Sequence, residues 1–409
     1  MTAPGNRRAY GVITGAYWSF TLTDGALRML VLLHFNSLGY SPLQIATLFL
    51  LYEVFGMATN LIGGWIGARR GLGLTLRCGL ALQLFALVMM ALLDESWPLA
   101  ATVLYVLIAQ GISGIAKDFT KMSAKSAVRL LGQAGEQSRL FRWVAMLTGS
   151  KNAIKGGGFF LGGLLLAILG YRPALLAMGG LILLAFLASL LLPGGLGKAR
   201  DKPPLKGLMA KSRAVNRLSL ARLFLFGSRD VWFAVGLPIY LYDVMGWQFS
   251  GVGGFLALWV IGYGIVQAAV PALLGTGKDS AAGNRQTRAA RRWVIGLALV
   301  PAGLALGLHE GLEPLVFVIG GLAVFGFIFA VNSALHSYLI LAWSSRDDTA
   351  TNVGFYYMAN AAGRLLGTIL SGVMYQVAGI TGCLVASSVM LTLAALVSRR
   401  LPGGPQPPR

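Results

Sequence analysis

Residues 16–33, AYWSFTLTDGALRMLVLL, form an apolar run of the length that crosses a bilayer, with an acid and a base near its middle. Asp24 and Arg28 are four residues apart, so a helix places both side chains on one face. Charges at this depth are costly in lipid and usually face a partner or a water-filled cavity inside a helix bundle. The stretch therefore predicts a membrane helix with an inward charged face. That face either lines a substrate or ion path, or only fixes helix packing through a self-neutralising pair.

The composition of the whole chain also indicates a helical membrane protein. Of its 409 residues, 56% are hydrophobic and only 12% are charged, whereas a soluble domain has about 25% charged residues. The two cysteines, Cys78 and Cys383, lie in separate apolar runs, so neither a disulfide framework nor a thiol-rich metal site is indicated. We expect no cofactor. The first apolar run is a full span without a small-residue cleavage site, and we interpret it as a membrane helix rather than a signal peptide.

Apolar runs of about 20 residues predict an all-α membrane protein with twelve transmembrane helices. The basic stretch 193–217, with which we group Arg222, is expected to be a cytoplasmic linker between two six-helix halves, 1–192 and 218–398. Residues 399–409 would then form a cytoplasmic tail. The expected spans are 10–35, 42–67, 74–93, 99–118, 143–169, 173–192, 218–244, 251–274, 293–309, 315–341, 350–377 and 380–397.

The two halves resemble each other in their charged residues. The first span of each half carries an acid that is followed by a glycine and an aromatic residue, and the fifth carries an asparagine and a base. These residues are Asp24 and Asp230, Asn152 and Asn360, and Lys155 and Arg364. Two parallel six-helix repeats are the arrangement of major facilitator transporters, which the chain resembles over its whole length. The resemblance implies a site near the midplane between the halves. The family's loop signature fits GWIGARRGLG only in part, since Ala68 replaces the acid.

The distribution of basic residues predicts the orientation in the membrane. Of the 34 Lys and Arg residues, Arg172 alone lies in the short turns expected on the outer side. Basic loops stay in the cytoplasm, so we expect a multi-pass protein of the inner (plasma) membrane with both termini cytoplasmic. The net charge of +20 is scattered over short loops, which argues against a nucleic-acid partner.

Charged residues inside the expected spans carry more positive than negative charge. A surplus of fixed positive charge at low dielectric is stable when a mobile anion neutralises it, which predicts a small anionic substrate. The alternative, internal pairing with the three acids, leaves bases over. The expected substrate-binding residues are Arg28, Lys151, Asn152, Lys155, Arg229, Asn360 and Arg364. The expected proton-coupling residues are Asp24, Glu53 and Asp230, because burial favours the neutral form of a carboxylate.

Other motifs do not indicate an enzyme. The fragments GGLGK and GTGK lack the first glycine and the Ser or Thr of a phosphate-binding loop. The three histidines lie apart and form no HExxH motif. In KDFTKMSAKSAVR, Lys117, Lys121 and Lys125 recur at four-residue steps. We interpret them as a solvated basic face at the cytoplasmic mouth, or alternatively as a relay that draws an anion inward.

Long strings between the first and the eighth expected spans carry a closer resemblance. They are GAYWSFTLTDGALRMLVLLHF, LLYEVFGMATNLIGGW, GISGIAKDFTKMS, LTGSKNAIKGGGFFLGG, LFLFGSRDVWFAVGLPIYLY and GGFLALWVIGYGIVQA. Together they are similar to the ArsJ family of organoarsenical efflux permeases. The resemblance implies export of 1-arseno-3-phosphoglycerate and arsenate resistance. It also implies functional coupling to glyceraldehyde-3-phosphate dehydrogenase, which forms this ester when arsenate replaces phosphate.

Two other transporter classes compete with this interpretation. An organophosphate/phosphate antiporter that imports a sugar phosphate has one arginine in its first span and one in its seventh, as Arg28 and Arg229 would provide. A multidrug exporter is disfavoured because its cavity is apolar or acidic. A membrane enzyme or receptor has no catalytic constellation to support it.

Overall fold

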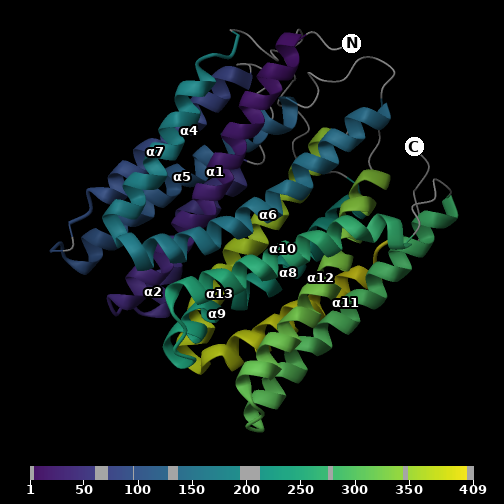
Figure 1. Ribbon diagram of the computed structural model, residues 1–409. Coiled ribbons are helices and arrows are strands. Elements are labelled where there is room, and N and C mark those ends of the chain that lie inside the picture. Colours follow the sequence, from purple (N-terminus) through teal and green to yellow (C-terminus); the bar gives the residue numbers. More distant parts are fainter. Residues whose placement is uncertain are drawn as a thin grey trace. The chain divides into compact units, whose positions relative to one another are not determined.

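The computed structural model describes residues 4–59, 72–94, 96–127, 137–193, 212–274, 280–343 and 349–402, and these ranges are almost entirely helical (Figure 1). The helices are α1 (Pro4–Ser37), α2 (Pro42–Leu48), α4 (Leu72–Ala91), α5 (Leu99–Ala127), α6 (Gln137–Leu169), α7 (Tyr171–Ser189), α8 (Arg213–Phe233), α9 (Gly236–Ile239), η2 (Tyr240–Val244), α10 (Phe249–Leu274), α11 (Ser280–His309), α12 (Pro314–Ala342) and α13 (Thr349–Arg399). The prediction of an all-α fold is confirmed.

Nine segments within the described ranges are long and apolar enough to cross a membrane. The last of them, Asn352–Arg399, holds two expected spans, since the backbone leaves helical geometry at Ala378 and Gly379. The expected spans 10–35 and 218–244 are not among the nine. They coincide with α1 and with the region from α8 to η2, which carry buried charged residues.

Glycines with positive φ mark the turns between an odd-numbered expected span and the next. A backbone in this region favours glycine because it has no Cβ. Two pairs, Gly39 with Gly246 and Gly170 with Gly379, fall at equivalent places in the two halves of the sequence, as the repeat predicts, whereas the counterpart of Gly311, the turn DESWP at 94–98, has no glycine. The glycines are Gly39, Gly170, Gly246, Gly311 and Gly379.

The chain forms two compact units. Unit 1 comprises Met1–Leu38, Leu51–Leu205 and Gln248–Val260, and unit 2 comprises Gly39–Leu50, Lys206–Trp247 and Ile261–Arg409. In unit 1, α1 packs on α5, α6 and α7, and α4 packs on α5 and α7. In unit 2, α13 packs on α2, α8 and α11, and α11 packs on α12. The domain boundaries proposed from the sequence stay a prediction, because most of 193–217 and of the tail, like Ala68 and its loop motif, lies outside the described residues.

Glycines bring α1 close to α6 in unit 1. A Cβ on Gly158 would collide with the carbonyl oxygen of Leu22, and a Cβ on Gly162 would collide with the backbone of Ala26. Small residues of this kind let two membrane helices approach until their backbones touch. The close approach also places Lys155, one turn before Gly158, opposite the acid of α1.

Glycines also bring α8 close to α13 in unit 2. A Cβ on Gly363 would meet the carbonyl oxygen of Leu223, and a Cβ on Gly367 would meet the backbone of Gly227 and the side chain of Asp230. Side chains one helical turn away from these glycines therefore lie close together, and they include Asp230 and Arg364.

Candidate functional site

In unit 1 the acid and the base of α1 have different partners. Arg28 Nη1 donates to Glu53 Oε1 at 3.1 Å, and Glu53 is almost completely buried. The Asp24 carboxylate accepts a hydrogen bond from Tyr52 Oη at 2.6 Å and lies 3.9 Å from Lys155 Nζ. The interpretation of Asp24 and Arg28 as a pair that only neutralises itself is therefore too simple, since each reaches another helix.

A third buried acid of unit 1, Asp118 on α5, was missing from the sequence-based set of charges. It is fully buried, accepts a hydrogen bond from Thr59 Oγ1 and lies 2.7 Å from Lys121 Nζ. Lys117 Nζ lies 3.8 Å from the centre of the Tyr52 ring. The prediction of a solvated basic face is therefore wrong for Lys117 and Lys121, because one stacks on a ring and the other pairs with an acid. The side chain of Lys125 is outside the described residues.

The remaining predicted site residues of unit 1 lie on α6. Lys151 and Asn152 are half-buried and come one helical turn before Lys155. Next to them, Ser150 Oγ accepts a hydrogen bond from Trp18 Nε1 at 3.1 Å. This bond ties the start of the predicted polar stretch of α6 to α1, the helix that carries Asp24.

In unit 2 one buried carboxylate lies between two arginines. Arg229 Nε donates to Asp230 Oδ1 at 2.6 Å, and Arg364 Nε donates to Asp230 Oδ2 at 3.2 Å. The Asp230 side chain is 3% exposed, whereas the two arginines keep 16% and 18% exposure. One acid thus holds two guanidinium groups in place from α8 and α13.

Arg222 is a third arginine of unit 2 and was grouped with the linker from the sequence, which is wrong. It lies inside α8 and is only 4% exposed. Its Nε donates to Asn360 Oδ1 at 3.0 Å, and its Nη1 donates to the carbonyl and the hydroxyl of Ser333 at 3.2 Å and 3.0 Å. The guanidinium also lies 3.8 Å from the Phe226 ring. Asn360 thereby joins the charged residues of unit 2 through Arg222.

One signal in the sequence indicated this position. Arg222 falls inside the expected span 218–244 and precedes Arg229 by seven residues, which is close to two helical turns. Both arginines therefore lie on the same face of α8. Within the described part of unit 2, Arg222, Arg229 and Arg364 are buried or half-buried on α8 and α13, and Asp230 is the one described buried acid on these helices.

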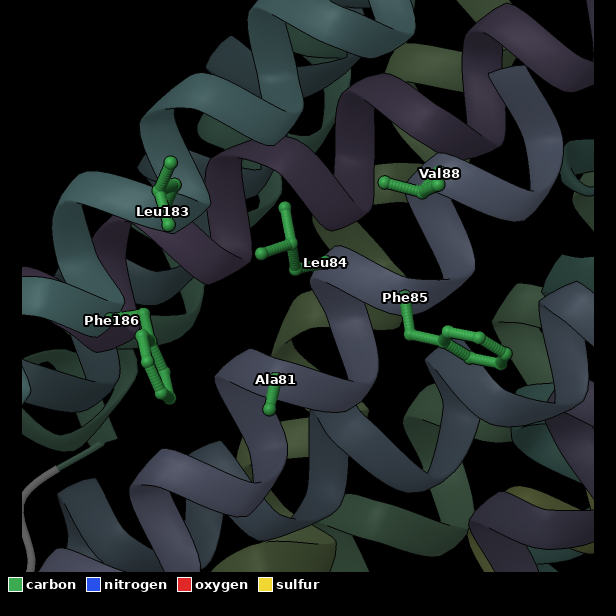
Figure 2. Close-up of a pocket in the computed structure, with 6 residues that line it drawn as sticks. All are labelled: Ala81, Leu84, Phe85, Val88, Leu183 and Phe186. Atoms are coloured by element: carbon green, nitrogen blue, oxygen red, sulfur yellow. The ribbon is translucent and has the colours of Figure 1, made fainter. Parts of the chain in front are cut away.

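A separate pocket in unit 1 lacks the chemistry for binding a charged ligand. It has a volume of about 340 Å³ and lies between α4 and α7, and Figure 2 shows that its six labelled side chains carry only carbon. They are Ala81, Leu84, Phe85, Val88, Leu183 and Phe186. Several of these side chains are exposed, as expected of a surface that faces lipid chains.

These features, two six-helix repeats with charges buried in apolar helices, define a polytopic membrane transport protein. A profile of the Major Facilitator Superfamily matches residues 13–282, which is more than half of the chain. The chain belongs to the Major Facilitator Superfamily, whose members transport small molecules across a bilayer and are not enzymes. No curated protein sequence matches the chain.

Solved structures with the same fold extend over nearly the whole chain. An inward-facing bacterial homologue of the iron transporter ferroportin has a TM-score of 0.69 at 16% identity, over 95% of this chain and 98% of its own. A bacterial metal transporter has a TM-score of 0.66 at 15% identity, over 98% and 99%. The human organic anion transporter MFSD10 (TETRAN) has a TM-score of 0.64 at 18% identity, over 97% and 100%. At these identities the likeness concerns the fold.

Proposed function

We propose that this protein is a secondary active transporter that exports an organic oxyanion. The observation that carries the proposal is the charge of unit 2, where three arginines are balanced by a single described carboxylate. A buried positive charge without an acid is costly, and a bound anion removes that cost. The surplus favours an anionic cargo over a metal cation, whatever the cargo of structurally similar proteins.

The residue types favour a phosphate-like group. Arginine offers a planar fork of donors that grips two oxygens of one oxyanion, whereas lysine contributes a point charge. Arg229 and Arg364 present two such forks beside Asp230. Their side chains keep some exposure, which is needed if a ligand is to reach them.

The resemblance to the ArsJ family indicates which oxyanion we propose as the substrate. It suggests 1-arseno-3-phosphoglycerate, which carries a phosphate and an arsenate ester and no cation. Because glyceraldehyde-3-phosphate dehydrogenase must first form this ester, the transporter would confer arsenate resistance only together with that enzyme. A pentavalent oxyanion also requires no cluster of thiolates, in keeping with a chain that has two cysteines.

The test uses everted membrane vesicles that contain the protein. Supplied with arsenate, glyceraldehyde 3-phosphate, the nicotinamide cofactor and the dehydrogenase, they should accumulate arsenic. Vesicles with Arg229→Gln should not, although the protein reaches the membrane. Accumulation without the dehydrogenase would identify free arsenate as the substrate instead, and protection of cells against arsenite would contradict the proposal.

The alternative is an organophosphate/phosphate antiporter that imports a sugar phosphate. It is favoured by the placement of Arg28 on α1 and Arg229 on α8, since each lies beside an acid on the first helix of its half. Binding of a phosphate group does not separate the two functions, but direction does. Right-side-out vesicles loaded with phosphate should take up glycerol 3-phosphate only if the antiporter assignment is correct.

The orientation is proposed from the basic loops: inner membrane, both termini cytoplasmic. Single cysteines introduced at Ser41, Trp97 and Gln248 should react with an impermeant thiol reagent added outside. Cysteines at Lys202 and Arg288 should react only after the membrane is opened. Labelling of both groups from the same side would contradict the predicted topology.

A further inference from the structure

Several polar side chains surround a buried hydroxyl beside Arg222. The hydroxyl of Ser333 is fully buried, accepts from Arg222 Nη1 at 3.0 Å, and also lies 3.4 Å from Gln267 Nε2 and 3.5 Å from Tyr263 Oη. These groups come from α8, α10 and α12. Donors from α8 and α10 thus converge on one small oxygen, an arrangement that suits an anion better than a hydroxyl.

A buried histidine in the same place has no hydrogen bond. His336 follows Ser333 by three residues on α12, so both side chains lie on one side of that helix. It is 0% exposed, and neither ring nitrogen has a hydrogen-bond partner among the described residues. A buried imidazole normally satisfies at least one nitrogen, so a partner is missing.

One nitrogen of the Arg222 guanidinium group has no hydrogen bond to a described residue. Its contacts to Asn360 and Ser333 involve Nε and Nη1, while Nη2 makes no hydrogen bond to any residue that the structure describes. No described carboxylate lies within ion-pair distance of it either. Stacking on Phe226 and Tyr356, at 3.8 Å and 5.0 Å, compensates only part of the cost of burying the charge.

We propose that Arg222, Gln267, Ser333 and His336 form a second anion site in unit 2, which takes an oxyanion of the phosphate class. The site lies about 10 Å along α8 from Arg229, on the same face of the helix. Its occupant is either a free inorganic anion or the second charged group of a substrate that has two. The ligand class rests on the proposed function, whereas the existence of the site rests on the surroundings of Arg222.

The test counts the anions that the purified full-length protein binds. Equilibrium dialysis with labelled inorganic phosphate should give two bound phosphates per chain for the wild type. Arg222→Gln should retain the phosphate at Arg229 and Arg364, and Arg229→Gln should retain the one at Arg222. A stoichiometry and affinity unchanged by Arg222→Gln would overturn the second site. If Arg222→Gln loses a bound phosphate and Arg229→Gln loses none, the result would support the second site and refute the proposed function. Failure of the second site and failure of the proposed function therefore give different results.

A two-headed probe, 3-phosphoglycerate, separates the two sources of the anion. If the site holds the second charged group of the substrate, Arg222→Gln should weaken 3-phosphoglycerate binding by about ten- to a hundred-fold, as expected for a lost charge-assisted contact. If it holds a free anion, the affinity for 3-phosphoglycerate should stay the same while the second phosphate is lost. Both results support the site and differ only in its occupant.

Two further variants and a control distinguish loss of the second site from misfolding of the protein. Arg222→Lys keeps the charge but loses the fork, and His336→Gln removes the imidazole; each should weaken binding of the second phosphate in a protein that elutes as folded. The control is Arg291→Gln, since Arg291 of the same unit binds the carbonyl of Ser398 and that of Leu401. It should lower stability without changing the phosphate count. Loss of the second phosphate in the control as well, or in neither further variant, would overturn the proposal.

Discussion

The two units contain the same acid–base contact, built with different residues. In unit 1, Asp24 on α1 lies 3.9 Å from Lys155 on α6, and in unit 2, Asp230 on α8 is bound by Arg364 on α13 at 3.2 Å. In each case glycines one turn further along let the two helices touch. The contact is thus part of the sequence repeat, and the change from lysine to arginine distinguishes the units.

The balance of charge differs around these contacts. Each of the three buried acids that the structure describes in unit 1 has a base within ion-pair distance, since Arg28 binds Glu53, Lys121 binds Asp118 and Lys155 faces Asp24. The further half-buried bases described on α1, α5 and α6 are lysines. In unit 2 the single acid Asp230 faces two arginines, and the third, Arg222, has no ion pair with an acid that the structure describes. Arginine is permanently charged, whereas buried carboxylates and lysines can change protonation state. Under the proposed function, the fixed charges of the arginines assign the anion to unit 2, and the titratable residues of unit 1 are the candidates for proton coupling.

The largest difference is expected between the two repeated acids. Asp230→Asn leaves two arginines without a counter-charge and should cost about 3–5 kcal/mol of stability. Asp24→Asn retains an oxygen that accepts from Tyr52 and loses only a longer contact to a partly exposed lysine, so it should cost about 1 kcal/mol. Thermal unfolding of both variants in detergent checks this. Equal losses would mean that the units do not differ in charge balance.

The helix contact that underlies the repeat gives the next effect. In Gly158→Ala the new methyl group meets the carbonyl of Leu22 and should cost about 1–3 kcal/mol. The matched control is Gly157→Ala, one residue away, where the nearest atom of another residue is a Leu22 methyl at 3.7 Å. It should be neutral or slightly stabilising, because alanine favours a helix. Similar unfolding temperatures for the two variants would contradict the close packing of α1 and α6.

Much of the fold could be predicted from the sequence because it follows from hydrocarbon length and from the period of the repeat. The turn glycines Gly39 and Gly246, and the repeated acids Asp24 and Asp230, stand at matching distances along the chain. Such signals are local and need no knowledge of contacts. Membership in the Major Facilitator Superfamily follows from the same pattern.

The candidate site was less predictable, because a residue's depth depends on which helix covers it. Arg222 was grouped with the cytoplasmic linker, and Asp118, in a stretch rich in lysine, was left out of the buried charges. In the structure Arg222 is covered by α12 and α13, and Asp118 by the helix that ends at Thr59. The partners that decide burial lie 59 and 138 residues away in the sequence, and no local pattern reports them.

Substitution of the bases in the repeated contact tests which unit binds the anion. Arg364→Lys keeps the charge but loses the fork, so affinity for 3-phosphoglycerate should fall about tenfold. Lys155→Arg adds a fork in unit 1 and should change this affinity little, because the anion is expected at unit 2. Isothermal titration of both purified variants measures the difference. A larger loss from Lys155→Arg would reverse the roles assigned to the units.

The smallest effect on binding is expected from Glu53→Gln, which tests the role of unit 1 in proton coupling. The amide oxygen of glutamine can still accept from Arg28 Nη1, which lies 3.1 Å from Glu53 Oε1, but Arg28 loses its counter-charge. Stability should therefore fall by about 3 kcal/mol, as for other broken buried pairs, while the affinity for an anion bound in unit 2 should change little at one pH. What the variant loses is a buried group that can take up and release a proton. Transport into vesicles should therefore become nearly independent of pH, while Asp230→Asn should be inactive at every pH. If the pH profile of Glu53→Gln matched that of the wild type, coupling through Glu53 would be excluded, and Asp24, the other predicted coupling acid of unit 1, would be the residue to test in the same assay.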